Sequence, residues 1–185
     1  MIDGVHHSKL DFCEGCVLGK QTKVSFGIAE HKSKDVLEYV HTDVWGPAPC
    51  LSYGGARYFV SFVDDFSRKV WVYFMKSKDE TFDRFQSWKS LVEKQSGKKV
   101  KVLRSDNGGE FTSQKFIKFC ESEGIKRHYT TPGDPQLNGV AEMNRTLLER
   151  TRFLQLTVGL NKRFWAEALS TVVFLINRIP STVII

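Results

Sequence analysis

The chain has 185 residues, of which 41% are hydrophobic and 12% aromatic, enough for one domain with a real core. A formal net charge of +6 suits a polyanionic partner, although a solubilising basic surface explains the same charge. Four cysteines and no recognisable signal peptide indicate a reducing compartment, and no apolar run reaches membrane-spanning length, which excludes an integral membrane protein.

The first 26 residues hold a pair of cysteines at a spacing found in zinc sites. Cys13 and Cys16 are separated by two residues, and tetrahedral zinc needs two further ligands. His6 and His7 lie a few residues before them. Two ordinary surface thiols are nearly as good an explanation. Residues 27–36 are polar and predict a linker, so we expect the folded core to begin at Leu37.

From Leu37 onward, the hydrophobic periodicity predicts alternating β and α segments. Three strands are followed by a helix, a strand, a helix, a strand and two helices, over residues 37–44, 57–63, 70–76, 79–93, 99–103, 113–122, 125–130, 139–158 and 162–178. This order predicts an α/β fold with a mixed five-stranded sheet flanked by helices. Asp64 and Asp65 fall in the turn after the second strand and are expected to cap it. The apolar side of the first helix is predicted to include Leu91.

Three acidic residues occupy positions that suit a metal site. Asp43 lies in a β-like segment that a Gly-Pro pair ends, and Asp106 follows a predicted strand and precedes the turn Asn-Gly-Gly. Glu142 falls in the first turn of a predicted helix, with 35 residues between it and Asp106. If the three converge, they form an all-oxygen site for Mg²⁺ or Mn²⁺. Such a site suits phosphoryl transfer by two ions about 3.5–4 Å apart.

The same acids and their surroundings resemble the integrases of copia-type LTR retrotransposons. The resemblance rests on the words HTDVWGP, FVDDFSRKVWVY, RSDNGGEFTS, TPGDPQLNGVAE and FWAEAL…LINR, in unbroken order over nearly the whole chain. Asp43, Asp106 and Glu142 match the Asp, Asp-35-Glu pattern of retroviral-type integrases. The resemblance implies a ribonuclease-H-like fold for residues 37–185, as a catalytic core cut short at its C-terminal end.

The resemblance also implies chemistry, partners and location. Asp43 would bridge two Mg²⁺ or Mn²⁺ ions, with Asp106 binding one and Glu142 the other. The reactions would be trimming of the element's cDNA 3′ ends and attack of those ends on target DNA, carried out by a homo-oligomer. The chain would be made in the cytoplasm within a polyprotein and act in the nucleus. Residues 1–26 would be the tail of a zinc-binding pre-integrase module whose histidine pair precedes Met1, so we expect incomplete Zn²⁺ binding.

Basic residues near the expected site are candidates for binding DNA phosphates. They are Arg104, Lys126, Arg127, Arg145, Arg150 and Arg152. For each, a solvated surface charge is the simpler alternative. Gln136 and Asn138, in the loop before Glu142, are candidates for contacting DNA near the cleaved bond.

The helix that carries Glu142 departs from the family pattern. The family usually has a basic residue between this Glu and Met-Asn-Arg-Thr, whereas here Met143 follows Glu142 directly. One residue on a helix is a rotation of about 100°. The predicted apolar stripe of this helix comprises Met143, Leu147, Thr151, Leu154 and Val158. If this stripe packs against the core, Glu142 points away from the aspartates unless the start of the helix bulges. This departure leaves a second hypothesis open, namely that the chain is a catalytically impaired relic of an integrase that binds nucleic acid. A third hypothesis, a non-integrating nuclease of the same fold, is disfavoured by the 35-residue spacing.

Overall fold

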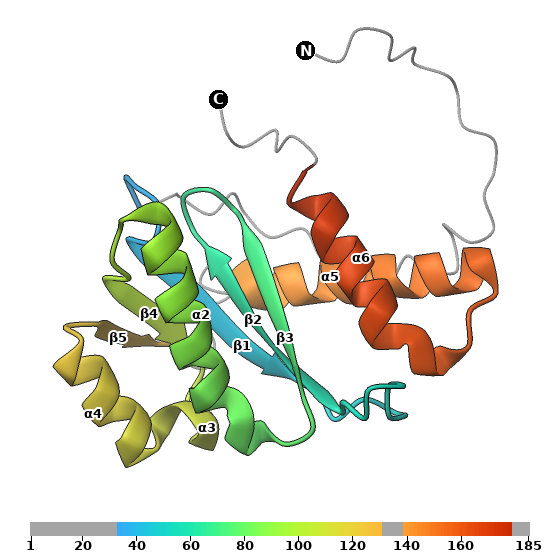
Figure 1. Cartoon of the computed structure of the whole chain (residues 1–185), viewed down its shortest axis with the longest axis horizontal. Coiled ribbons are helices and arrows are strands. Elements are labelled where there is room, and N and C mark those ends of the chain that lie inside the picture. The colour runs from blue at the N-terminus through green and yellow to red at the C-terminus, as the bar shows by residue number, and fades with distance from the viewer. Residues whose placement is uncertain (1–32, 131–138, 179–185) are drawn as a thin grey trace, which may run out of the picture.

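The computed structural model describes residues 33–130 and 139–178, which form a central five-stranded sheet covered by helices on both faces (Figure 1). The strands are β1 (Tyr39–Trp45), β2 (Tyr58–Asp64), β3 (Val70–Met75), β4 (Val102–Ser105) and β5 (Lys126–Tyr129), in the order β3-β2-β1-β4-β5. β1, β2 and β3 pair antiparallel, whereas β1 pairs with β4 and β4 with β5 in parallel. The predicted mixed five-stranded sheet is confirmed, and its arrangement is that of a ribonuclease-H-like fold.

Glycine ends β1 for a steric reason. Gly46 has φ +134°, a backbone conformation that residues with a side chain rarely adopt. A Cβ atom at this position would also lie 2.5 Å from Cδ1 of Tyr58 and 2.8 Å from the carbonyl oxygen of Arg57. The close approach of β1 and β2 at this point therefore requires glycine.

The helices follow the predicted order, with three short helical segments beside them. The 3₁₀ turn η1 (Lys78–Glu80) leads into α2 (Thr81–Ser96), and α3 (Gly109–Thr112), which the sequence did not predict, precedes α4 (Gln114–Ser122). The last helices are α5 (Gly139–Val158) and α6 (Trp165–Ile176), joined through the 3₁₀ turn η3 (Lys162–Phe164). Among the described helices, none is both long and apolar enough to cross a membrane.

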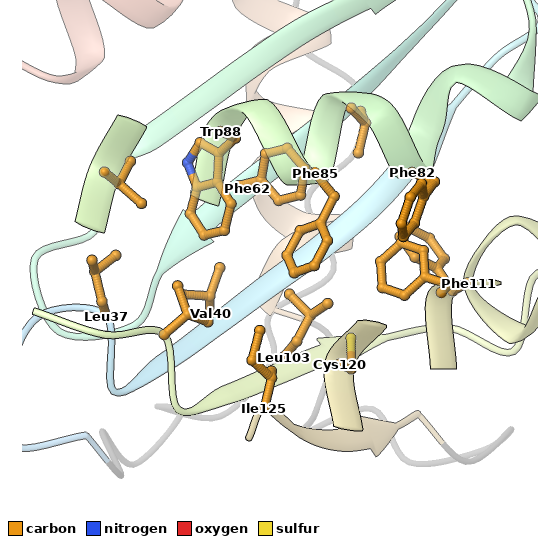
Figure 2. Packing of buried hydrophobic residues seen from close by; sticks show 14 of the residues in the cluster. Leu37, Val40, Phe62, Phe82, Phe85, Trp88, Leu103, Phe111, Cys120 and Ile125 are labelled. Carbon is orange, nitrogen blue, oxygen red and sulfur yellow. The ribbon is translucent and has the colours of Figure 1, made fainter. Parts of the chain in front are cut away.

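Aromatic side chains fill the core between the sheet and α2, α3 and α4 (Figure 2). The rings of Phe62 and Trp88 stack with centroids 4.4 Å apart, and those of Phe85 and Phe116 stack at 4.9 Å. Leu103 of β4 is fully buried in the same cluster. Each such side chain contributes roughly 1.5–3 kcal/mol through burial, so this layer fixes the sheet that carries the expected site.

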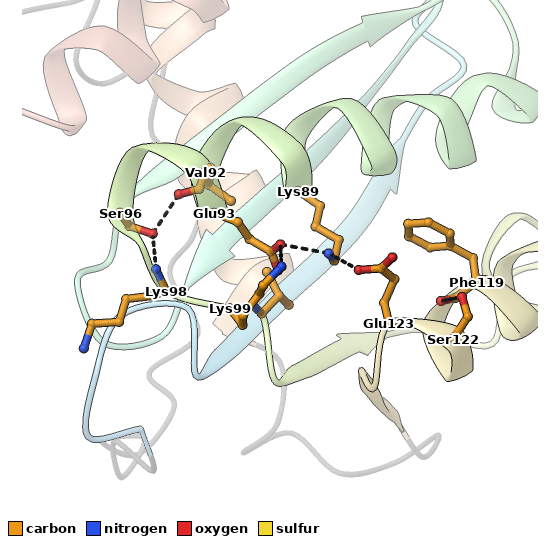
Figure 3. A network of polar contacts seen from close by, with 10 residues as sticks. Lys89, Val92, Glu93, Ser96, Lys98, Lys99, Phe119, Ser122 and Glu123 are labelled. Atoms are coloured by element: carbon orange, nitrogen blue, oxygen red, sulfur yellow. Dashed lines mark hydrogen bonds and ion pairs between the residues drawn. The ribbon is translucent and has the colours of Figure 1, made fainter.

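The buried side of α2 differs from the prediction at one turn. Leu91 is 44% exposed, whereas Lys89 and Glu93 are buried. Nζ of Lys89 contacts Oε2 of Glu93 at 2.9 Å and Oε2 of Glu123 at 2.7 Å (Figure 3). The other Glu93 oxygen accepts the backbone N–H of Val100 at 3.0 Å. This network joins α2 to the end of α4 and to the residues just before β4. Ion pairs therefore lie on the side of α2 where the sequence predicted an apolar contact of Leu91.

A second core lies on the opposite face of the sheet, under α5 and α6. Leu147 of α5 and Leu169 of α6 are fully buried against Phe59 of β2. Indole Nε1 of Trp165 donates to the carbonyl oxygen of Cys50 at 3.1 Å. Val158, predicted to belong to the buried stripe of α5, is 62% exposed because the helix has run past the sheet by that point.

Asp64 caps the turn after β2, as predicted, whereas the hydrogen bonds of Asp65 go to residues outside the turn. Asp64 is fully buried and accepts the backbone N–H groups of Leu37 at 2.7 Å and Ser67 at 2.8 Å. Asp65 accepts the hydroxyl of Ser33 at 2.6 Å and contacts Nε2 of His41 at 3.2 Å. The segment before β1 is therefore attached to the core from Ser33 onward.

Candidate functional site

The two predicted aspartates meet at one end of two neighbouring strands. Asp43 lies near the C-terminal end of β1, and Asp106 directly follows β4. β1 and β4 run parallel, with His41 of β1 opposite Arg104 of β4. Because carboxyl ends of adjacent parallel strands lie at the same edge of a sheet, the register brings the two carboxylates together.

A tight turn after β4 fixes Asp106. Its Oδ1 accepts the backbone N–H of Gly108 at 3.0 Å. A Cβ atom on Gly108 would lie 2.9 Å from the carboxylate of Glu110 and 3.0 Å from Oδ1 of Asp106, so both carboxylates flank this glycine. Glu110 is held by Nζ of Lys78 at 3.1 Å, with its side chain 9% exposed. Glu110 is a carboxylate near the site that the sequence analysis did not single out.

Asp43 is shielded from water and contacts a residue of α5. Nδ2 of Asn144 donates to Oδ2 of Asp43 at 2.9 Å. Burial raises the pKa of the Asp43 carboxyl, the hydrogen bond from Asn144 opposes this rise, and the charges of Asp106 and Glu110 add to it. A site that resists a negative charge in this way is one where a cation would relieve the repulsion.

Glu142, the third predicted acid, lies within the bounds of α5, but its side chain falls outside what the structure describes. Among the α5 side chains that the structure describes, Asn144, two residues later, donates a hydrogen bond to Asp43. The sequence held a signal for this contact, because Asn144 lies three residues before Leu147 and so shares its helical face. The metal ligands predicted from the sequence were acids, so Asn144 was not among the predicted site residues.

A family model described as the integrase core domain matches residues 34–135 of the chain. This match covers more than half of the sequence and includes both aspartates. The chain belongs to the integrase core domain family.

Relatives of this integrase core are found in transposon polyproteins. It is 50% identical over 170 residues to the Retrovirus-related Pol polyprotein from transposon TNT 1-94 of Nicotiana tabacum, covering 91% of the chain. It is 37% identical, over 94% of the chain, to the polyprotein from transposon RE2 of Arabidopsis thaliana. It is 34% identical, over 90% of the chain, to the Truncated transposon Ty1-A Gag-Pol polyprotein of Saccharomyces cerevisiae. The chain spans only 13%, 12% and 15% of these relatives' respective lengths.

The fold also matches a solved structure. The integrase core superposes on a chain of the simian T-cell lymphotropic virus intasome in complex with PP2A regulatory subunit B56 gamma, with a TM-score of 0.62 and 19% identity. The match covers 91% of this chain and 58% of that one. At this identity the likeness establishes a shared fold.

Two of the predicted DNA-binding arginines of the integrase core are used inside the fold. Arg104 is 6% exposed on β4, where its charge opposes the rise that burial causes in the pKa of Tyr39. Arg127 donates to the carbonyl oxygen of Phe111 at 2.9 Å, and its guanidinium lies 4.7 Å from the ring centre of Phe116. Arg104 is buried and Arg127 is half-buried, so both guanidinium groups have contacts within the fold, and the DNA contacts predicted for them stay predictions.

Other predicted basic residues remain on the surface. Lys126 is exposed on the edge strand β5, and Arg152 is exposed on α5. Arg145 pairs with Glu149 at 3.0 Å. A surface pocket of about 290 Å³ joins this part of α5 to the site, since Asp43, Asn144, Arg145 and Arg152 all line it.

Several predicted residues lie outside the part of the chain that the structure describes. Gln136 and Asn138, the candidates for contacting the cleaved bond, belong to the loop before α5. The possible zinc ligands, His6, His7, Cys13 and Cys16, precede residue 33. For all of these, the predicted roles stay predictions.

The site fits a divalent cation in part. Asp43 and Asp106 supply carboxylate oxygens of the kind that Mg²⁺ and Mn²⁺ prefer. The pKa of Asp43 is raised first by burial and then by the charges of Asp106 and Glu110, and a cation would relieve that repulsion. Within residues 33–130 and 143–178, whose side chains are described, no group of three or more His, Cys, Asp or Glu residues is placed to hold a metal ion. A third ligand must therefore come from another residue type or from outside these ranges.

Proposed function

We propose that the chain is the catalytic core of an integrase that joins the 3′ ends of retrotransposon cDNA to target DNA and processes those ends beforehand. The observation that carries this proposal is the meeting of Asp43 and Asp106 at neighbouring strand ends, in a chain that belongs to the integrase core domain family. The intact protein is proposed to be a polyprotein product that is made in the cytoplasm and acts in the nucleus.

We expect some residues of the site to bind the metal ions and others to position the metal-binding carboxylates. Asp43 and Asp106 would hold Mg²⁺ or Mn²⁺, and Asn144 orients the Asp43 carboxylate through its 2.9 Å hydrogen bond. When bound, such cations activate an attacking oxygen and stabilise a leaving one in phosphoryl transfer. The turn at Gly108 keeps Asp106 in place before the substrate arrives, which limits reorganisation during the reaction.

DNA would approach along the basic surface beside the pocket. Arg145 and Arg152 line that pocket together with Asp43, and Lys126 lies exposed at the edge of the sheet. We expect these cations to bind phosphates of the cDNA ends or of target DNA, which fixes the duplex without reading its sequence. Assembly into a homo-oligomer with the rest of the integrase is part of the same proposal.

A second candidate function is a relic that binds nucleic acid but transfers strands poorly. The observation that favours it is the position of Asn144 at Asp43, because Glu142 stands two residues earlier on α5. Successive residues of a helix are rotated by about 100°, so positions 142 and 144 lie on nearly opposite sides of its axis.

A strand-transfer assay separates the two functions. The chain, joined to its natural flanking sequence, is incubated with a cDNA-end duplex, a target plasmid and Mn²⁺. The integrase proposal predicts joined products that disappear in Asp106→Asn, while DNA binding by this variant persists. The relic predicts DNA binding without joined products in either protein. A processing assay on a blunt cDNA end, run with the same proteins, tests the trimming step.

A further inference from the structure

Two loops that lie side by side form an exposed surface of aromatic and basic side chains. Residues 46–57 connect β1 to β2, and residues 159–164 connect α5 to α6 (Figure 1). The backbone N–H of Tyr53 in the first loop donates to the carbonyl oxygen of Arg163 in the second at 3.2 Å. We call this the aromatic-basic surface, and its principal side chains are Tyr53, Arg57, Lys162, Arg163 and Phe164.

Arg163 is held above an exposed aromatic ring. Its guanidinium carbon lies 4.7 Å from the centre of the Tyr53 ring, and the rings of Tyr53 and Phe164 are 4.5 Å apart. Tyr53 is 51% exposed, so the ring and the guanidinium both face solvent. A guanidinium that already rests on a ring loses little further side-chain freedom on binding, which prepares Arg163 for an anionic ligand.

The charge of the aromatic-basic surface is not balanced by acids. Residues 46–57 and 159–164 contain no Asp or Glu, whereas Arg57, Lys162 and Arg163 are all exposed. Among the described residues, none of these cations forms an ion pair, not even with Glu167, which follows Arg163 by one helical turn. Exposed cations beside apolar rings complement the phosphates and sugars of a nucleic acid.

One side of α5 leads from the aspartate site to this surface. Leu148 and Arg152 line the pocket at Asp43, and Gln155 stands seven and three positions after them, on the same helical face. Nε2 of Gln155 donates to the carbonyl oxygen of Lys162 at 3.3 Å. At about 1.5 Å per residue, Gln155 lies about 16 Å along the helix axis from the α5 residue that contacts Asp43.

We infer that the aromatic-basic surface binds the phosphate backbone of the cDNA duplex about five to eight base pairs inside the 3′ end that reacts at the aspartate site. The spacing follows from the separation along α5, at about 3.4 Å per base pair. Arg163 contacts a phosphate, and Tyr53 is a positioning residue for Arg163. The inference rests on the proposed function, in which the cDNA end occupies the site during both trimming and joining. A contact with cDNA therefore serves both reactions, whereas a contact with target DNA serves only the second.

Substitution of single phosphates tests this contact without an activity assay. The chain, joined to its natural flanking sequence, is titrated into cDNA-end duplexes that carry one neutral methylphosphonate each, and binding is followed by fluorescence anisotropy. Arg163→Ala should weaken binding to the unmodified duplex by about tenfold and flatten the dependence of log affinity on log salt by about 0.9. A methylphosphonate about five to eight base pairs inside the end should weaken binding by the native chain similarly, with no further effect on Arg163→Ala.

Three more variants separate this contact from general charge and from folding. Lys118→Ala removes an exposed cation of α4, on the other face of the sheet, and should bind every duplex like the native chain. Tyr53→Ala should weaken binding and add nothing to Arg163→Ala, whereas Tyr53→Phe keeps the ring and should bind like the native chain. Thermal melting identifies any variant that is not folded, in which case Arg163→Lys, with its charge but no planar guanidinium, replaces Arg163→Ala and should bind more weakly than the native chain.

The inference fails if Arg163→Ala binds all duplexes like the native chain, or if no cDNA phosphate depends on Arg163. It also fails if the dependent phosphate lies in a target duplex scanned in the same way. A change in molecular mass by light scattering, with unchanged DNA affinity, would assign the surface to contacts between copies of the chain instead. Absence of joined products from the native chain would count against the proposed function, while the dependent phosphate still decides this inference.

Discussion

The ionised Asp43 carboxylate is expected to lower the stability of the metal-free fold, as a residue of the proposed cation site. Its carboxyl is largely withdrawn from water, and the nearby charges of Asp106 and Glu110 disfavour a further negative charge. Asn144 supplies only part of the compensation, through one hydrogen bond. Residues that serve function in this way often reduce the stability of the metal-free fold.

Asp43→Asn is therefore expected to stabilise the metal-free protein. The native carboxyl has a pKa above its ordinary value of 3.8, so its ionisation destabilises the fold as the pH rises through the folded pKa. At pH 7 we expect the variant to melt roughly 2–4 °C higher, the change that about 1 kcal/mol produces in a chain of this size. Below pH 3.8 the acid is neutral in both states and the advantage should vanish. Calorimetry at the two pH values checks this, and an equal advantage at both would contradict it.

Among the elements, α2 is anchored by charge as well as by its aromatic face. Lys89 contacts two carboxylates. Burial lowers its pKa, but the hydrogen bonds that Lys89 donates to Glu123 and Glu93 outweigh this effect, so the pKa is raised overall. Because Glu93 is also buried, removing Lys89 leaves its charge less well compensated, with the exposed Lys99 at 3.0 Å as its remaining cation. The ion pairs thus hold α2 and α4 at fixed positions over the sheet.

Lys89→Ala should destabilise the fold strongly for this reason. Breaking a buried ion pair by deleting one partner costs about 3–5 kcal/mol, and Glu123, which is partly exposed, moderates the loss to roughly 3 kcal/mol. Urea unfolding followed by circular dichroism measures the change. Lys94→Ala, an exposed position on the same helix, is the matched control and should change the free energy of unfolding by less than about 0.5 kcal/mol.

Among the helices, we expect the rotational register of α5 to determine whether the proposed strand transfer takes place. Inserting one Arg between Glu142 and Met143 places the glutamate three residues before the asparagine, on the face that reaches Asp43. We expect strand-transfer activity to rise and Mn²⁺ to bind more tightly, because a third carboxylate is added to the aspartate pair. Insertion of Arg after Gly159, beyond the end of α5, controls for chain length. Unchanged or lost activity in a folded insertion variant would show that the register argument is wrong.

For the whole molecule, the excess of positive charge predicts salt-sensitive DNA binding. The net charge of +6 is distributed over a chain in which Arg152 borders the pocket beside Asp43, whereas Lys115 of α4 pairs with Asp83 of α2. Each phosphate neutralised steepens the dependence of log affinity on log salt by about 0.9. The surface around α5 is therefore expected to dominate this dependence.

Arg152→Ala should weaken binding to a duplex oligonucleotide and reduce that slope by about one phosphate contact. Fluorescence anisotropy between 50 and 200 mM salt, roughly the range over which such contacts are resolved, provides the measurement. Lys115→Ala removes the same charge from the opposite side of the sheet and should leave the slope nearly unchanged. Equal effects of the two variants would show that binding follows net charge and not this surface.

The sequence by itself determined the order of the elements and the pairing of Asp43 with Asp106. Periodicity identifies strands and helices from local information, whereas the meeting of the two aspartates also needs β1 and β4 to be neighbours, which the resemblance implied. The tertiary structure decided which side chains face inward within each element. Leu91 lies outside while Lys89 lies inside, and Arg104 and Arg127 serve the interior.

The same distinction applies to the third residue of the site. A motif gives Glu142 its place in the chain, but the rotation of α5 depends on the burial of Leu147 against strands more than eighty residues earlier. Side chains two positions apart on a helix point in nearly opposite directions, because each residue turns the helix by about 100°. Only the packed fold could place Asn144 at Asp43, because long-range packing, and not the local motif, sets the rotation of the helix.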